Sequence, residues 1–128
     1  MKTAPMRVGI VGSRDFTDAD QILDIITSFP PGTVIVSGGA AGADTIAAAC
    51  AERCGLAVEI HPALWDKHGK RAGFMRNRVI VANVDRVIAF FGPSGITPGT
   101  YSTVRLALEA RVPVACLFQR QPGTVIHD

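Results

Sequence analysis

Three glycines within five residues follow a β-branched apolar run and precede an alanine-rich segment. They stand in Ser37–Asp44, after which apolar residues recur at helical spacing. Glycine lets a backbone turn sharply and lets a ligand approach without meeting a Cβ. The start of the following helix offers unpaired N–H groups and a partial positive charge, which together suit an anion. The pattern favours a phosphate-binding loop over a connection that binds nothing, with these contacts: Gly38, Gly39, Ala40 and Gly42.

A second turn of glycine and hydroxyl residues stands near residue 100, ahead of another helical pattern. Its segment, Pro98–Thr103, is a second candidate cradle for a phosphate or a ribose. The alternative is an ordinary helix cap by a serine or threonine. The candidate contacts in this turn are Gly99, Thr100, Ser102 and Thr103.

Charged and polar groups stand close to these turns. Gly12-Ser13-Arg14 follows the first apolar strand, and an arginine binds phosphate in a bidentate manner. Alternatively, Arg14 is a surface residue paired with Asp15 or Asp18. Asp44 would repel a phosphate placed on the helix start, so its expected partner is a ribose or a base, and the alternative is helix capping.

A basic segment follows the third strand, with cations at Lys67, Lys70, Arg71, Arg76 and Arg78. Lys70, Arg76 and Asn77 are candidate ligand contacts, and the alternative is a solvated basic helix face. Trp65, the single tryptophan, stacks on a base or else anchors its loop on the core.

Strand-like and helix-like segments alternate along the chain with short connections. This order predicts one domain spanning residues 1–128, with a loose tail from about residue 119. We expect a three-layer Rossmann-like α/β fold, in which helices cover both faces of a mainly parallel five-stranded sheet. The expected strands are 7–12, 33–37, 56–61, 86–91 and 112–118, and the expected helices start near residue 18 and span 43–54, 69–82 and 100–111.

The helical pattern also predicts inward faces. Residues 69–82 place Ala72, Met75, Val79 and Ala82 on one face, and residues 100–111 place Val104, Ala107 and Leu108 together. A helix is predicted over 69–82, and the alternative is a strand at the β-branched run Val79-Ile80-Val81. Ligands in such folds bind beyond the carboxyl ends of the strands, near the point where the strand order reverses.

Composition and motif spacing argue against several classes of protein. A net charge of +2 is too mild to imply nucleic-acid binding by itself. The glycine spacings match neither the P-loop, nor the dinucleotide-binding G-x-G-x-x-G, nor the G-x-S-x-G of hydrolases. The histidines and cysteines lack zinc-site spacing, so no metal and no cofactor is implied. Cys50, Cys54 and Cys116 are expected as free core residues of a cytoplasmic protein, and no apolar run is long enough for a membrane span.

As a set, these motifs resemble the SLOG superfamily, in particular its YspA, or cpYpsA-related, group. The resemblance covers roughly residues 7–118 and rests on Gly12–Phe16, Ser37–Asp44, Pro62-Ala63-x-Trp65, Gly69-Lys70-x-Ala72-Gly73 and Arg76-Asn77. It implies a nucleotide or ADP-ribose-like ligand that is sensed or sequestered, often in phage or bacterial defence. It also implies a homo-oligomer, for which Met75 and Val79 are a candidate surface.

Two other branches of the superfamily imply alternatives. LOG-type phosphoribohydrolases cut the N-glycosidic bond of nucleoside monophosphates, and their catalytic glutamate is replaced by Thr103 here. Under that alternative, the candidate catalytic residues are Asp44 and Arg76. DprA proteins bind single-stranded DNA and carry stretches similar to Ser37–Asp44 and Arg76-Asn77-Arg78. A nucleotide-like small molecule is the expected partner, and single-stranded nucleic acid is the alternative.

Overall fold

A computed structural model describes residues 5–120, and most of the predicted tail lies outside this range. Five parallel strands form one sheet in the order β3-β2-β1-β4-β5. The strands are β1 (Arg7–Gly12), β2 (Val34–Ser37), β3 (Ala57–Ile60), β4 (Arg86–Phe91) and β5 (Val114–Phe118). The helices are α1 (Ala19–Thr27), α2 (Ala43–Arg53), α3 (Trp65–His68), α4 (Ala72–Ala82) and α5 (Pro98–Glu109), with a 3₁₀ turn, η1 (Gly69–Arg71).

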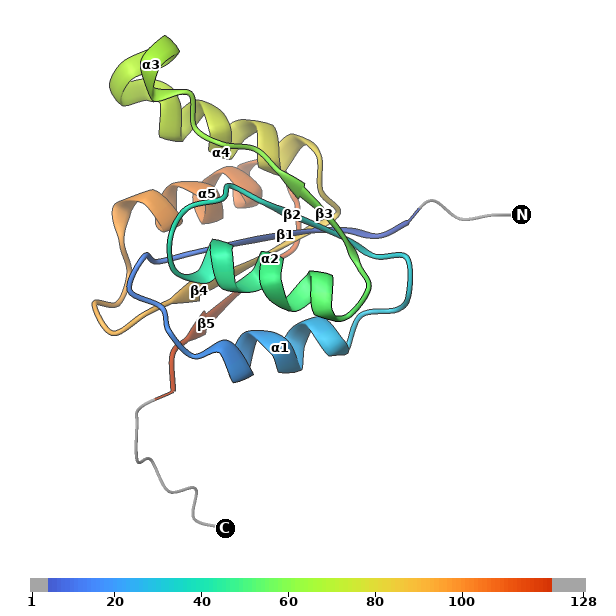
Figure 1. Cartoon of the computed structure of the whole chain (residues 1–128). Coiled ribbons are helices and arrows are strands. Elements are labelled where there is room, and N and C mark those ends of the chain that lie inside the picture. The colour runs from blue at the N-terminus through green and yellow to red at the C-terminus, as the bar shows by residue number, and fades with distance from the viewer. Residues whose placement is uncertain (1–4, 121–128) are drawn as a thin grey trace.

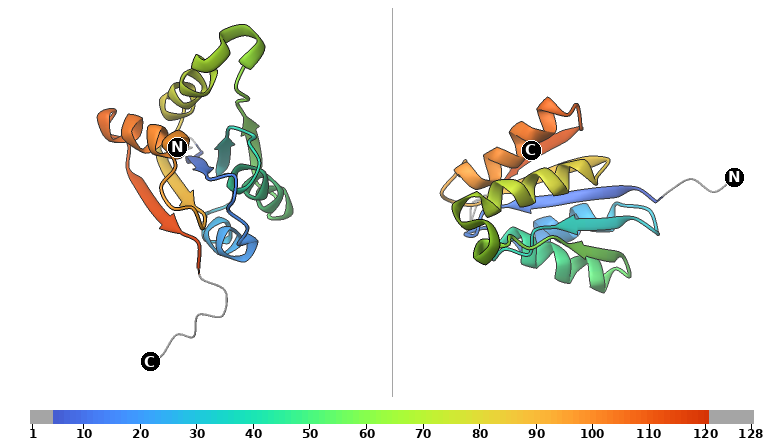
Figure 2. Two further views of the ribbon diagram at one scale, coloured as in Figure 1. Left: turned by 90° about the vertical axis from the view of Figure 1, so that its left-hand side faces the viewer. Right: turned by 90° about the horizontal axis from the view of Figure 1, so that it is seen from above.

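Helices cover both faces of the sheet, as predicted (Figures 1 and 2). On one face, Ile22 and Ile26 of α1 and the small residues of α2 pack on β1, β2 and β4. On the other face, Ile80 of α4 and Val104 of α5 pack on the same strands. The β-branched residues of β1, β2 and β4 are buried from both sides, which is typical of a parallel sheet.

The strand order reverses between β1 and β4. The chain leaves β1 toward β2 on one side of the sheet and leaves β4 toward β5 on the other side. The register pairs Gly12 with Phe90, so the loops after β1 and β4 start side by side. The connections therefore diverge at this point and leave a crevice between them, where ligands of such folds bind.

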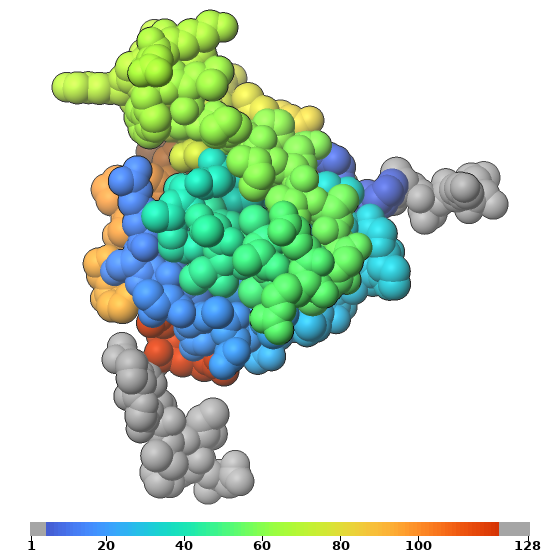
Figure 3. Space-filling model, viewed as in Figure 1, coloured from blue at the N-terminus to red at the C-terminus, as the bar shows by residue number. Residues whose placement is uncertain are grey.

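The segment before α4 differs from the sequence prediction. Trp65 begins the short helix α3 rather than lying in a loop, and η1 then leads into α4, which begins at Ala72. Figure 3 shows α3 standing out from the rest of the surface. The predicted strand alternative for Val79-Ile80-Val81 was wrong, because this run lies inside α4 with Ile80 and Val81 facing the core.

Five positions predicted to face the core need correction. On α4, Met75 and Val79 are 37% and 43% exposed and Ala82 is exposed as well, because the helix turns Ala72, Asn77, Ile80 and Val81 inward instead. Leu108 of α5 is exposed, and so is Cys116, because β5 is an edge strand with partial cover. Within the described residues, no helix has the length and apolar character needed to cross a membrane.

Candidate functional site

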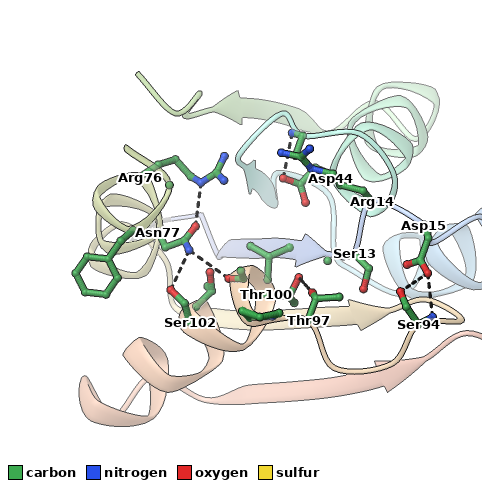
Figure 4. Close-up of a pocket in the computed structure, with 18 of the residues that line it drawn as sticks. Ser13, Arg14, Asp15, Asp44, Arg76, Asn77, Ser94, Thr97, Thr100 and Ser102 are labelled. Atoms are coloured by element: carbon green, nitrogen blue, oxygen red, sulfur yellow. Dashed lines mark hydrogen bonds between the residues drawn. The ribbon is translucent and has the colours of Figure 1, made fainter. Parts of the chain in front are cut away.

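A pocket of about 590 Å³ opens where the strand order reverses, a volume within the range of small-molecule sites. Four segments build it: the loop after β1, the start of α2, the segment from α3 to α4, and the loop that leads into α5 (Figure 4). The lining residues are Val11, Gly12, Ser13, Arg14, Asp15, Ala40, Asp44, Trp65, Gly73, Phe74, Arg76, Asn77, Ser94, Thr97, Pro98, Gly99, Thr100, Ser102 and Thr103.

Hydrogen bonds tie the loop after β1 to the loop after β4. The buried Ser13 hydroxyl accepts from the Gly92 N–H at 3.1 Å, and the Asp15 carboxylate accepts from the N–H and the hydroxyl of Ser94. The hydrogen bonds from Ser94 hold the pKa of Asp15 below its usual value. Asp15 therefore stays ionised at neutral pH and links the loop after β1 to the loop after β4.

Arg14 makes neither of the ion pairs considered from the sequence. Asp15 is bonded to Ser94, and Asp18 accepts from Arg120 at 2.9 Å. Within residues 5–120, Arg14 takes part in no ion pair, and its exposed side chain lines the pocket. Its guanidinium is therefore free to meet an anion.

Other atoms of the protein fill most of the space next to the glycine-rich loop, residues 38–42. A Cβ on Gly42, whose φ is +80°, would overlap the carbonyl oxygens of Ser13 and Arg14. The Ala43 N–H already donates to the Ser13 carbonyl at 3.3 Å. The start of α2 therefore packs closely against the loop after β1. The Ala43 N–H is already bonded to this loop and is not available to a ligand.

Gly38 makes room for an arginine from α4. A Cβ there would lie 2.8 Å from Cζ of Arg76 and 3.0 Å from Oδ2 of Asp44. Arg76 donates to the Gly38 carbonyl at 3.0 Å and to Oδ1 of Asn77 at 2.9 Å. A guanidinium has five N–H donors, so most of this group stays available beside the pocket.

Asn77 joins α4 to the start of α5. It is 6% exposed, and its amide nitrogen donates to the Gly99 carbonyl at 3.3 Å and to the Ser102 hydroxyl at 3.1 Å. Its oxygen orients Arg76. Asn77 thus positions a cation and a helix start relative to each other.

Asp44 is a buried carboxyl group on the wall of the pocket. Only 4% of it is exposed, and it accepts from the Ala40 N–H at 3.3 Å. Burial raises its pKa to about 6, against the lowering effects of the backbone N–H of Ala40 and the charge of Arg76. Arg76 and Asp44 form no direct ion pair within the described residues.

Replacing Asp44 with asparagine is expected to stabilise the fold at neutral pH. Because the folded pKa lies above the unfolded value of 3.8, the native state binds more protons between about pH 4 and 6. The wild-type penalty is therefore complete above pH 6 and amounts to about 3 kcal/mol at most. Urea unfolding from pH 4 to 8 should show the gain of Asp44→Asn growing with pH, and a gain independent of pH would contradict the assignment.

Among residues 5–120, no side chain caps the start of α5. The Thr97 hydroxyl at its N-cap donates to the Thr100 hydroxyl at 3.2 Å instead of accepting from a backbone N–H. Pro98 carries no N–H, so the first-turn donors are those of Gly99 and Thr100. Both residues line the pocket.

Two aromatic residues belong to the lining of the pocket. Trp65 is 52% exposed and Phe74 is 50% exposed, so neither side chain belongs to the core. The indole packs against α4, since a Cβ on Gly73 would lie 3.2 Å from Cη2 of Trp65. The alternative that Trp65 anchors a loop on the core is therefore wrong.

Most predicted site residues line this pocket: Gly12, Ser13, Arg14, Ala40, Asp44, Trp65, Arg76, Asn77, Gly99, Thr100, Ser102 and Thr103. Gly38 and Gly42 lie behind it, against Arg76 and the backbone of the loop after β1, and Gly39 faces the Ile60 side chain. Lys70 is exposed on η1 and lies outside the lining. The role of each residue as a ligand contact stays a prediction.

Sequence reasoning missed Asp15, Phe74, Ser94 and Thr97 as lining residues. Asp15 and Ser94 follow β1 and β4, the two strands that flank the reversal of strand order. The strand-end rule pointed at both loops, but the individual side chains could not be chosen without the tertiary pairing.

Comparisons with known proteins agree with this architecture. The family model described as YspA, cpYpsA-related SLOG family matches residues 6–68. The Gene 61 protein of Mycobacterium phage D29 is 40% identical over 118 residues, covering 84% of this chain and 93% of that protein. The X-ray structure of DNA processing protein A (DprA) from Streptococcus pneumoniae matches with a TM-score of 0.59 at 20% identity. That match covers 87% of this chain but only 58% of DprA, and it shows a shared fold. The chain thus belongs to the YspA, cpYpsA-related SLOG family.

Proposed function

We propose that this chain binds a nucleotide or a nucleotide-derived molecule, such as ADP-ribose, in the pocket between β1 and β4. The observation that carries the proposal is the meeting of two cations with an uncapped helix start. Arg14 and Arg76 lie around the same pocket as the first-turn N–H groups of α5. Such a combination of donors suits a phosphate group.

The phosphate is proposed at the start of α5 rather than on the glycine-rich loop. The buried carboxyl of Asp44 occupies the start of α2, and backbone carbonyls fill the space behind Gly42. An anion placed there would meet a carboxylate at neutral pH, since that group has a pKa of about 6. The start of α5 carries no acidic residue in its first turn.

Hydroxyl groups line the space between these two helix starts. Ser13, Thr100, Ser102 and Thr103 suit the ribose and phosphate oxygens of a nucleotide, as hydroxyls both donate and accept. Asp44, on the opposite wall, offers acceptors for ribose hydroxyls. The pocket thus has a cationic part and a part rich in hydroxyl groups, in agreement with a phosphorylated sugar.

Gly99→Ala tests the phosphate position. A Cβ on Gly99 meets nothing within 4 Å, and alanine favours a helix over glycine by up to about 1 kcal/mol. The variant should therefore unfold at the same or a higher temperature. It should also bind adenosine 5′-monophosphate at least about 10-fold more weakly, because a methyl group costing about 1.4 kcal/mol would stand in the phosphate's place.

Calorimetric titration of both proteins with adenosine 5′-monophosphate provides the readout. Unchanged affinity in a Gly99→Ala protein of full stability would contradict the proposed position of the phosphate. Loss of affinity together with loss of stability would show a structural role for Gly99 instead.

A second candidate is cleavage of the N-glycosidic bond. It is favoured by Asp44, a buried carboxyl with a pKa of about 6 on the pocket wall, which suits a general acid or base near neutral pH. Against it, Thr103 is a buried threonine where LOG-type enzymes carry glutamate. Chromatography of adenosine 5′-monophosphate reactions decides: adenine and ribose 5-phosphate should form with wild type and not with Asp44→Asn. Absence of product with wild type would remove this candidate.

A further inference from the structure

We propose that Trp65 and Phe74 form a nucleobase subsite, so that the ligand of this pocket carries an unpaired base. This inference rests on the proposed function, because it assigns a partner for the base of the same ligand whose phosphate is proposed at the start of α5. Both rings line the pocket and remain about half exposed. An aromatic base offers a π-face for such rings, whereas a sugar phosphate leaves them without a partner.

The two rings stand on two helices that are adjacent along the chain. Trp65 is the first residue of α3, and Phe74 lies in the first turn of α4. Gly73 lets the indole approach α4, because any side chain there would press on Cη2. A glycine inside a helix costs about 1 kcal/mol relative to alanine. Gly73 therefore weakens α4 but allows the close contact with Trp65.

The same helix that carries Phe74 also supplies polar groups to the pocket. Arg76 and Asn77 of α4 line the pocket together with the two aromatic residues. The lining therefore combines aromatic surface with a cation and hydrogen-bonding groups. This combination matches a base joined to a ribose phosphate, and it disfavours inorganic phosphate or a bare sugar phosphate as the preferred ligand.

The base has two sources that share this chemistry: a free nucleotide or the end of a single strand. The segment from α3 to α4, which carries both aromatic residues, also carries four exposed cations: Lys67, Lys70, Arg71 and Arg78. These charges are available to a nucleic-acid backbone running out of the pocket.

Because Trp65 is the single tryptophan of the chain, its fluorescence reports on this subsite directly. Wild type should bind adenosine 5′-monophosphate more tightly than ribose 5-phosphate, and the nucleotide should quench the indole. In Phe74→Ala, affinity for adenosine 5′-monophosphate should fall by about 5- to 150-fold, the range for loss of one base-stacking ring. Affinity for ribose 5-phosphate, measured by calorimetry, should not change.

The outcomes separate the two proposals. Equal weakening of both compounds, or no weakening of either, would overturn the base subsite and leave phosphate binding in place. Failure of wild type to bind any of the nucleotide, ribose 5-phosphate and oligonucleotide probes would overturn the proposed function itself. Leu108→Ala serves as the control, because that exposed apolar side chain of α5 lies outside the pocket.

A 5′-phosphorylated thymidine octamer distinguishes the sources. Tighter binding of the octamer than of thymidine 5′-monophosphate, weakening steeply between 50 and 200 mM salt, would identify a strand end as the ligand. Similar affinity for both probes, with little dependence on salt, would identify the free nucleotide. Either result supports a base subsite if indole quenching accompanies binding, and binding of both without quenching would contradict it.

Discussion

Arg76→Met is expected to weaken binding of adenosine 5′-monophosphate by about 10- to 150-fold, the equivalent of 1.5–3 kcal/mol for a charged hydrogen bond. The guanidinium is fixed by Gly38 and Asn77, so its remaining donors meet the phosphate without further ordering. Methionine keeps the apolar stem and removes the charge. Calorimetric titration at constant ionic strength measures the change.

The matched control is Arg78→Met, on the same helix. Arg78 is exposed and lies outside the pocket lining, yet its replacement changes the net charge by the same amount. We expect wild-type affinity for the mononucleotide in this variant. Equal losses in both variants would indicate attraction by overall charge rather than a specific contact of Arg76.

Gly42→Ala is expected to lower the free energy of unfolding by about 2–5 kcal/mol. Two costs combine: a non-glycine residue at φ +80° costs about 1–2 kcal/mol, and overpacking costs about 1–3 kcal/mol more. The overpacking arises because the new methyl group would overlap the carbonyl oxygens of Ser13 and Arg14. Urea unfolding monitored by circular dichroism measures the change.

Gly55→Ala separates the two costs. Gly55 has φ +73°, but a Cβ there would meet nothing within 4 Å. Its replacement should therefore show the conformational cost alone, about 1–2 kcal/mol. If Gly42→Ala were no more destabilising than Gly55→Ala, the close packing of the start of α2 against the loop after β1 would not be what requires glycine at position 42.

The sheet and its strands were predictable because their signals are local. The apolar runs 7–12 and 86–91 match β1 and β4 to the residue, and Asp18 caps α1 as its type suggests. The segment Val79-Ile80-Val81 was ambiguous, since β-branched residues are common in strands. Tertiary packing resolves the ambiguity, because α4 places Ile80 and Val81 in the core against the sheet.

The general place of the site was also predictable, because strand-end loops meet at one edge of a parallel sheet. The atoms that lie next to each glycine could not be predicted from the sequence. Gly38, Gly42 and Gly99 look alike in sequence, yet a Cβ would meet an arginine, two carbonyl oxygens and open space, respectively. Only the fold distinguishes a glycine that admits the protein's own atoms from one that leaves room for a ligand.

We propose that a phosphorylated ligand binds between β1 and β4 with its phosphate at the start of α5. The most direct test is a two-dimensional ¹⁵N NMR titration of the full chain with adenosine 5′-monophosphate. We expect the largest shifts at the amides of Ser13, Arg14, Gly99 and Thr100 and at the indole N–H of Trp65. Shifts confined to Gly39–Gly42, or to α1 and β5, would contradict the account.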